Sequence, residues 1–196
     1  MMTSNRERLL DAATEVFLEH GYDASVDMLV ARAGVARQTF YNHFENKQCL
    51  FAEAMRNCVS DILVPLSGHS GDLRESLKRF AQTYRQRALS PQSIAKFRIV
   101  TGQAQRFPDL TGEAFALGLG EMLSSLADFL RAAMVQGRMS DADPGFAAEM
   151  LLSMLVGLER TRLLFGVPNP PQDEVLRVER IVDGFLRMFA VEQDME

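Results

Sequence analysis

A run of polar side chains between residues 37 and 47 has the chemistry to contact a nucleic acid. Arginine, glutamine, threonine and asparagine have donors and acceptors that suit base edges, while tyrosine, histidine and lysine commonly reach phosphate oxygens. Val35, Phe40 and Phe44 can point inward, but a helix of about two turns cannot bury the polar set around them. The polar residues are Arg37, Gln38, Thr39, Tyr41, Asn42, His43 and Lys47.

A preceding helix and a tight turn must position this polar helix. Ser25 is a suitable N-cap for a helix whose apolar residues recur at helical spacing as far as Ala33. Gly34 can end that helix in the left-handed conformation that other residues avoid. Asn46 is expected to cap the next helix, whose free amides and Lys47 would form an anion site for a backbone phosphate. The pattern predicts a helix-turn-helix.

Helical punctuation continues along the chain, and no strand pattern or repeat is seen. Ser4 and Glu7 form a capping-box pattern for a first helix that ends at Gly21. The sequence therefore predicts an all-α protein of about nine helices. A three-helix domain is expected at residues 1–47 and a larger helical bundle at 48–196, with helix four (about 47–64) shared. Later helices are expected to begin at Asp72, to span 90–108, 110–136 and 143–166, and to run from after 168–171 to about 191.

Composition limits the class of protein. The 196 residues, 47% of them hydrophobic, suffice for one helical core and a small added domain. No apolar run approaches the roughly 18 residues that suggest a membrane span. The N-terminal segment lacks a signal-peptide pattern, so a cytoplasmic protein is expected. Cys49 and Cys58 lie about 13 Å apart along one predicted helix and cannot bridge, so they are expected to be buried thiols, with a redox switch as the alternative.

The charge balance is unfavourable for a monomer on DNA. The net charge is −5, and residues 1–50 contain five Arg or Lys against seven Asp or Glu. Residues 32–47 have three positive groups against Glu45, so the positive field is expected to be local to the polar helix. We therefore expect binding as a dimer, with few phosphate contacts per subunit.

The predicted helix at 143–166 is apolar nearly all round. Between Phe146 and Leu158 its only polar residues are Glu149 and Ser153, so more than one side must be covered. Glycines in this helix and the last one favour close packing of helices. Both features indicate a four-helix interface with a second copy, and packing within one subunit is the alternative. The expected interface residues are Leu151, Leu155, Gly157, Leu158, Val182, Gly184 and Phe185.

The first fifty residues resemble the DNA-binding domain of the TetR/AcrR family of transcriptional regulators. Residues 98–110 resemble the C-terminal domain of its AefR-like branch. The resemblance implies phosphate contacts at Ser25, Tyr41, His43 and Lys47, and His43 could instead cap or pack. It also implies a dimer. The matching segments are Arg6–Ala13, Phe17, His20–Tyr22, Ala31–Val35 and Thr39–Lys47, and in the second region Arg98–Val100 and Ala104–Leu110.

Two features of the larger domain suggest a response to a small molecule. Pro108 forces a break in the segment Arg106-Phe107-Pro108-Asp109, and the resemblance places that break against the DNA-binding domain. It is therefore a candidate coupling element, or else a plain turn. Methionine and aromatic residues can line a pocket for an apolar effector, although such residues more often form core. The candidates are Tyr84, Phe97, Phe115, Met122, Phe129, Met150 and Met154.

These observations together predict a homodimeric transcriptional regulator. We expect a repressor that binds a palindromic double-stranded operator and is released by a small apolar ligand. Alternatives are an activator, a regulator without an inducer, and a ligand-binding dimer that no longer binds DNA. An enzyme is not expected, since phosphate loops, nucleophile motifs and metal-spaced ligand sets are absent. No cofactor is expected, and neither His20 nor His69 has a ligand-spaced partner.

Overall fold

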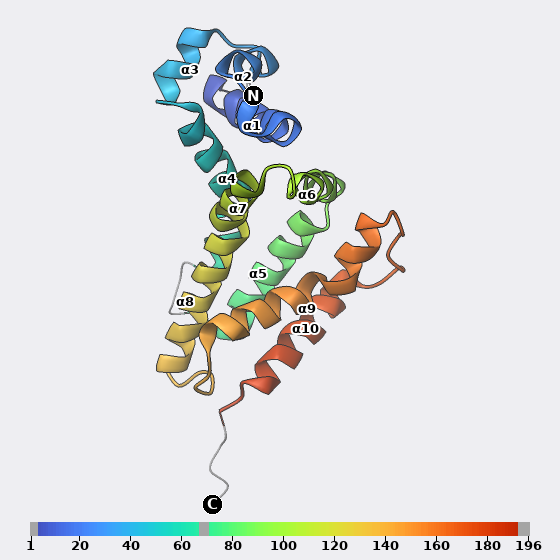
Figure 1. Ribbon diagram of the computed structural model, residues 1–196. Helices are drawn as coiled ribbons and strands as arrows, with labels where there is room; N and C mark the ends of the chain where they lie inside the picture. Colours follow the sequence, from blue (N-terminus) through green and yellow to red (C-terminus); the bar gives the residue numbers. More distant parts are fainter. Residues whose placement is uncertain (1–3, 67–70, 192–196) are drawn as a thin grey trace, which may run out of the picture. The chain divides into compact units, whose positions relative to one another are not determined.

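The protein is described by a computed structural model covering residues 4–66 and 71–191, and every regular element in these ranges is a helix. His69 lies outside the described residues. The chain forms two compact units, one of residues 1–59 with 96–120 and the other of residues 60–95 with 121–196. The division crosses α4 (Lys47–Leu63) and α6 (Pro91–Gln103), so both helices contribute to both units (Figure 1).

The first unit is built around the predicted helix-turn-helix. The capping box of Ser4 and Glu7 is present at the start of α1, and Gly21 caps its end, so the first predicted helix is confirmed. Gly34 adopts φ 62° and ψ 41° after α2, which is the left-handed conformation expected of it. Besides α4 and α6, the elements of this unit are α1 (Asn5–His20), η1 (Gly21–Asp23), α2 (Val26–Ala33), α3 (Arg37–His43), α7 (Pro108–Phe115) and a π-helical turn (Ala116–Gly120).

Aromatic side chains hold α3 and α4 against α1. Phe17 and Phe51 meet edge to face with ring centroids 5.0 Å apart, a favourable geometry for aromatic pairs. Phe40 and Phe44 are both buried, as their spacing predicts. Leu110 of α7 belongs to the same apolar core. The core of the first unit is therefore continuous from the short helices to α7.

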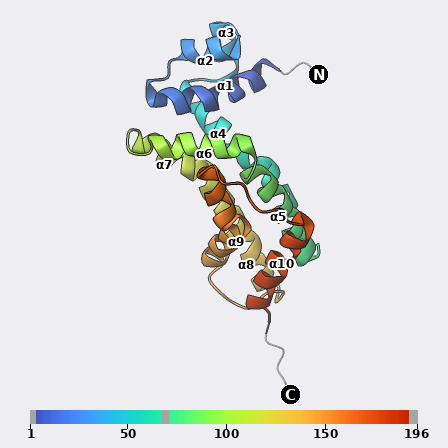
Figure 2. The same cartoon turned by 90° about the vertical axis from the view of Figure 1, so that its right-hand side faces the viewer.

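The second unit is a helical bundle in which α8 packs against α9 and α10 packs against α5 (Figure 2). Three of its helices begin at capped positions: Asp72 accepts the Glu75 amide at the start of α5, and Asp143 and Asp173 cap α9 and α10 in the same way. The elements are η2 (Val64–Leu66), α5 (Leu73–Ala88), α8 (Glu121–Val135), α9 (Pro144–Leu164) and α10 (Glu174–Met188).

Two expected helix boundaries need correction. The sixth helix ends at Gln103 and not at Pro108, because Pro108 occupies the first turn of α7, where its missing N–H costs no hydrogen bond. The expected helix over 110–136 runs from Pro108 to Val135 but contains the π-helical turn. Counted as one helix with its π turn, this segment brings the described residues to the predicted nine helices.

Gly157 has a different role from the one its sequence position suggests. It adopts φ 26° and ψ −126° and kinks α9, and a Cβ atom added there would meet nothing within 4 Å. In the subunit, the glycine therefore serves the backbone conformation and not a close approach between helices. Gly184, which has only the tip of Arg187 at 3.9 Å from such a Cβ, shows no close approach either.

Four of the expected dimer-interface residues are buried inside the subunit. Leu151, Leu155, Val182 and Phe185 are completely buried within the subunit, because they form the inner face of α9 and α10. Leu158 is 70% exposed and stays available to a partner. The apolar character of α9 thus reflects internal packing on one side and exposed apolar residues on the rest.

The cysteine expectation is also partly wrong. Cys49 is exposed, because its neighbours Leu50 and Phe51 occupy the inner face of α4. The side chain of Cys58 is outside the described part of the structure. In the described residues, no helix combines the length and apolar character needed to cross a membrane.

Candidate nucleic-acid interface

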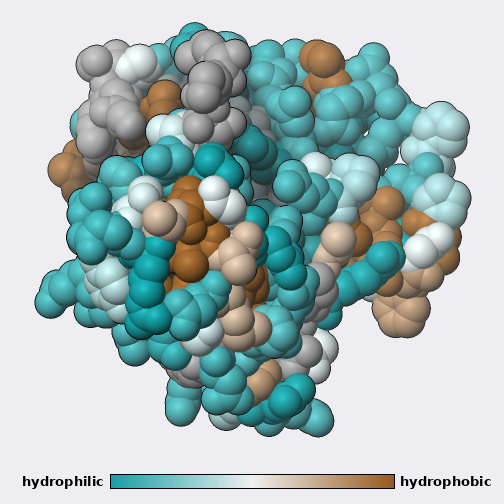
Figure 3. Space-filling model, turned by 90° about the horizontal axis from the view of Figure 1, so that it is seen from above, coloured by the Kyte–Doolittle hydropathy of each residue, from teal (hydrophilic) through white to brown (hydrophobic). Residues whose placement is uncertain are grey.

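The short helix α3 presents its polar residues outward. Arg37, Gln38, Asn42 and His43 are exposed, and Tyr41 is 47% exposed. Thr39 is half-buried. Buried Phe40 fixes the opposite side of the helix and packs edge to face with the Tyr41 ring at 5.2 Å. Seen from above the α1–α3 end of Figure 1, the surface is largely hydrophilic, with hydrophobic residues in separate patches (Figure 3).

Arg37 is held by two neighbours. Its Nη1 donates to Asp27 Oδ1 at 2.7 Å, and its guanidinium lies 5.9 Å from the centre of the Tyr41 ring. Hydrogen bonding with Tyr41, together with the charge and hydrogen bond of Asp27, raises the pKa of Arg37 above its ordinary value. The side chain is therefore charged and oriented before any ligand arrives.

Polar contacts within α3 also orient its amide residues. Gln38 Nε2 donates to Asn42 Oδ1 at 3.2 Å, one helical turn away. That bond does not use the side-chain carbonyl of Gln38 or the amino group of Asn42, an acceptor and a donor of the kind that adenine edges accept.

The predicted phosphate-binding residues take structural positions as well. The Ser25 hydroxyl caps α2 by accepting the Met28 amide at 3.2 Å, and its own proton is not used in that bond. Lys47 Nζ donates to the Ala24 carbonyl at 3.0 Å, which ties the start of α4 to the residue before α2. Asn46 caps α4 as predicted, accepting the Cys49 amide at 2.9 Å.

The other cations of this region have partners that the sequence did not suggest. Arg8 Nη2 donates to the Gly34 carbonyl at 2.9 Å and so clamps the turn of the helix-turn-helix. Arg32 bonds Glu15 and Glu19 at 2.8 and 2.7 Å. The side-chain hydrogen bond from Arg32, with its charge, lowers the pKa of Glu19 below its ordinary value. Arg32 thus offsets part of the negative charge of Glu15 and Glu19.

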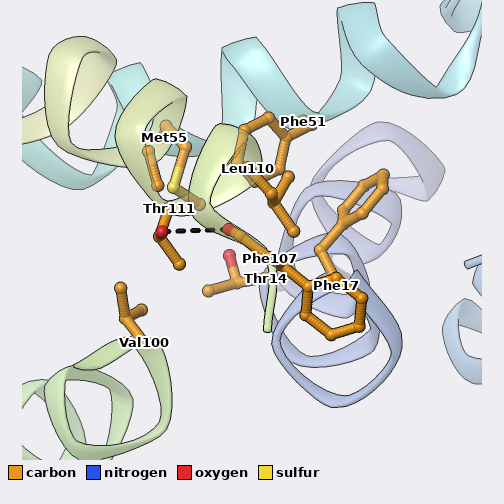
Figure 4. Close-up of a pocket in the computed structure, with 9 residues that line it drawn as sticks. Thr14, Phe17, Phe51, Met55, Val100, Phe107, Leu110 and Thr111 are labelled. Atoms are coloured by element: carbon orange, nitrogen blue, oxygen red, sulfur yellow. Dashed lines mark hydrogen bonds between the residues drawn. The ribbon is translucent and has the colours of Figure 1, made fainter. Parts of the chain in front are cut away.

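Partly buried Phe107 packs against the core of the first unit, while its neighbours Arg106 and Pro108 are exposed. A Cβ atom on Gly21 would come within 2.8 Å of the Phe107 ring, so the ring packs directly against that backbone. Thr111 Oγ1 donates to the Phe107 carbonyl at 3.0 Å (Figure 4). A small cavity of about 20 Å³ remains here, room for about one water. Its lining is Thr14, Phe17, Phe51, Met55, Val100, Phe107, Leu110, Thr111 and Ala114.

The candidate effector residues have unlike environments. Tyr84, Met122 and Phe129 are buried, and burial raises the pKa of Tyr84 despite the nearby Arg160. Met150 and Met154 are half-buried, and Met154 lines an open groove of about 540 Å³ between α9 and α10. Phe97 and Phe115 are exposed and belong to the other compact unit. An effector site made by these seven residues stays a prediction.

A buried ion cluster joins three helices of the second unit. Arg85 of α5 is 1% exposed and Glu159 of α9 is 3% exposed, and their closest atoms, Nη1 and Oε2, are 2.7 Å apart. Arg85 Nε also donates to Glu174 of α10 at 2.6 Å, and Arg177 Nε donates to Glu159 at 2.8 Å. Nothing in the sequence pattern pairs these residues, because Arg85 and Glu159 are 74 positions apart.

The kink in α9 is part of the same cluster. The carbonyl of Leu155, two residues before Gly157, accepts a hydrogen bond from Arg85 Nη1. Burial alone would lower the pKa of Arg85, but hydrogen bonds with Glu174 and Glu159 raise it above its ordinary value. Burial would raise the pKa of Glu159, but hydrogen bonds from Arg85 and Gln172 lower it. In the described residues, no group of His, Cys, Asp and Glu has the geometry to hold a metal ion.

Comparison with known proteins agrees with this geometry. Residues 9–54 match the family model for bacterial regulatory proteins of the tetR family, and residues 75–191 match that for the AefR-like transcriptional repressor C-terminal domain. A Bacillus subtilis HTH-type regulator, YdgC, is 28% identical, with 93% of each chain covered. The Mycobacterium repressor DhaR is 35% identical over 83 residues, 42% of each chain, so this chain spans less than half of its length.

Solved structures show the same fold. A regulator of the TetR family from Mesorhizobium loti superposes with a TM-score of 0.72 over 95% of this chain and 97% of that chain, at 24% identity. The C-terminal family model alone covers more than half of the chain, and the N-terminal model covers the helix-turn-helix whose turn, caps and polar helix the structure displays. The chain belongs to the TetR family of DNA-binding transcriptional regulators, which are not enzymes.

Proposed function

We propose that the protein is a cytoplasmic repressor that binds a palindromic operator as a homodimer. The observation that carries the proposal is the exposed polar face of α3, anchored from behind by buried Phe40 and Phe44. The family match to AefR-like repressors and the similarity to the repressor DhaR support repression over activation.

The groove contacts are assigned by chemistry and position. Arg37 and Gln38 stand at the N-terminal end of α3, the end that helix-turn-helix proteins present to base edges. Thr39 and Asn42 extend this surface. Tyr41, His43, Lys47 and Ser25 are proposed to contact phosphates, with the free hydroxyl proton of Ser25 as one donor.

A second copy is proposed to cover the outer face of α9 and α10. Exposed Leu158 lies on α9, and exposed Val175, Leu176 and Met188 lie on α10. Such residues on neighbouring helices favour an interface, because apolar surface gains free energy when it is removed from water. A dimer would place two copies of α3 about 34–36 Å apart, or a multiple of that spacing, to reach successive major grooves.

A small apolar effector is proposed to act on the spacing of the two reading helices. The packing of Phe107 against Gly21 supports the idea that α6 and α7 transmit the change to the DNA-binding unit. The coupling free energy is expected to be about 1–3 kcal/mol and equal in both directions. A regulator without an inducer would show no such reciprocal effect.

DNA titration tests the proposal directly. The protein is titrated against its own upstream region and against random duplex at several salt concentrations, with fluorescence anisotropy as the readout. The double variant R37Q/Y41F is expected to lose at least tenfold in operator affinity, while Q86A on exposed α5 surface serves as the control. Equal affinity for the two duplexes, or an unaffected double variant, contradicts DNA reading by α3.

Oligomeric state is tested by sedimentation at micromolar concentration. A dimer is expected, and the variant L158D is expected to shift it toward monomer because a charge would enter the apolar face. A wild-type protein that sediments as a monomer contradicts the dimer. Operator binding by such a monomer would leave only the DNA-reading part of the proposal standing.

A further inference from the structure

Asp27 is an acidic residue placed within the DNA-reading surface. It occupies the second position of α2, where the helix dipole favours a carboxylate. The helix itself is fixed by buried Leu29, Val30 and Ala33 on its other side. The carboxylate therefore has a defined place, ten residues before Arg37 and across the turn from it.

Its partner is the one permanent cation of α3. Among the residues of that helix, 37–43, Arg37 is the only arginine or lysine. The pair joins Arg37 Nη1 and Asp27 Oδ1 at 2.7 Å. Asp27 thus neutralises the charge that α3 would otherwise offer to a phosphate.

The pair contributes little to folding. Arg37 is 57% exposed and Asp27 is 70% exposed, and ion pairs so open to water stabilise a folded protein only weakly. An acceptor on DNA can therefore replace Asp27 as the partner of Arg37 at a small cost in free energy. A DNA phosphate replaces one anion beside Arg37 by another and is the same in every sequence, whereas a guanine edge accepts two parallel hydrogen bonds and occurs only where the sequence places it.

We infer that Asp27 is a specificity-determining residue, which holds Arg37 in an intramolecular pair that random DNA displaces poorly and the operator displaces well. The inference rests on the proposed DNA contact of Arg37. Asp27 acts through Arg37, so it is a positioning residue and not itself a DNA contact. Its removal should strengthen binding to all DNA and reduce the preference for the operator.

The experiment measures affinity for random duplex and for the upstream region between 50 and 200 mM salt, using the full chain. D27N is expected to bind random duplex about three- to tenfold more tightly at the low-salt end. For D27N, the slope of log affinity against log salt concentration should steepen by up to about one per subunit. The reason is that Arg37, no longer paired with Asp27, can contact a phosphate. The operator preference should fall by a similar factor.

Three further variants make the result specific. D27E keeps the charge and should resemble the wild type, and D11N removes an exposed carboxylate of α1 as a matched charge control that should change affinity less than twofold. In an R37Q background, D27N should have little effect. An equal gain from D27N with and without Arg37, or a gain from D11N as large as that from D27N, overturns the inference and leaves the proposed function intact. A wild-type protein that binds no DNA, or an R37Q variant that binds normally, overturns the proposed contact and the inference together.

Discussion

Two arginine–carboxylate pairs in this protein have the same chemistry and opposite environments. Arg37 and Asp27 are mostly exposed, while Arg85 and Glu159 are almost completely buried. The exposed pair lies where a ligand can replace one partner. The buried pair has further partners in Glu174, Gln172 and Arg177. These three residues reach solvent, but Arg85 and Glu159 themselves are shielded from water, so neither can exchange its partner for water without a large cost. Burial therefore decides whether such a pair can exchange with DNA or must stay as a structural element.

The largest effect is expected from breaking the buried pair. R85M leaves Glu159 as a buried carboxylate without its main partner and removes the donor to the Leu155 carbonyl, so a loss of about 3–5 kcal/mol in unfolding free energy is expected. Urea denaturation followed by circular dichroism measures it. The matched control is R74M, which breaks the more exposed pair of Arg74 with Asp183 and should cost less than about 1 kcal/mol. Equal losses would show that burial does not distinguish the pairs.

A smaller effect is expected at the kink beside this cluster. G157A forces a Cβ into a backbone conformation with φ 26°, so a loss of about 1–3 kcal/mol is expected although space for the atom exists. G184A is the matched control, because Gly184 lies in regular helix and alanine there should be neutral or stabilise by up to about 1 kcal/mol. The thermal unfolding midpoint should therefore fall in G157A and stay unchanged or rise in G184A. Stabilisation by both variants would contradict the kink.

Acid should weaken the buried cluster in part. The pKa of Glu159 is lowered in the folded protein, so its contribution to stability is complete above the ordinary glutamate pKa near 4.5 and is lost as the pH falls through the lowered value. The urea midpoint of the wild type should drop on acidification below about pH 4.5. E159Q should start from lower stability and show a flatter decline. An unchanged acid slope in E159Q would show that other carboxylates, such as Asp183 with its own lowered pKa, cause the decline.

The smallest effect on stability is expected at the exposed pair. D27N should change the unfolding free energy by less than about 0.5–1 kcal/mol, because both partners are hydrated before and after the change. Differential scanning calorimetry of D27N beside R85M measures the contrast. A loss in D27N comparable to that in R85M would mean that Asp27 holds the fold of the DNA-binding unit, and its effects on DNA affinity would then need a structural explanation.

Local sequence signals predicted the helix-turn-helix closely. Capping residues and the glycine of the turn act within three or four positions, so Ser4, Ser25, Gly34 and Asn46 could be read directly. Local signals did not tell which sides of α9 and α10 face the subunit core. Periodicity tells which residues are apolar, but whether Leu151 or Phe185 faces the subunit core or a partner depends on what packs against the helix.

The sequence by itself determined the fold class and the residues that could reach DNA, because helix caps, turn glycine and apolar spacing are properties of short segments. Tertiary structure decided the partners of the charges. Arg37 meets Asp27 only when α3 packs beside α2, and Arg85 meets Glu159 only when helices 74 residues apart in the chain pack together. It also decided the role of Gly157, since only the structure shows that the backbone of α9 takes a positive φ there, which a glycine accepts more readily than other residues.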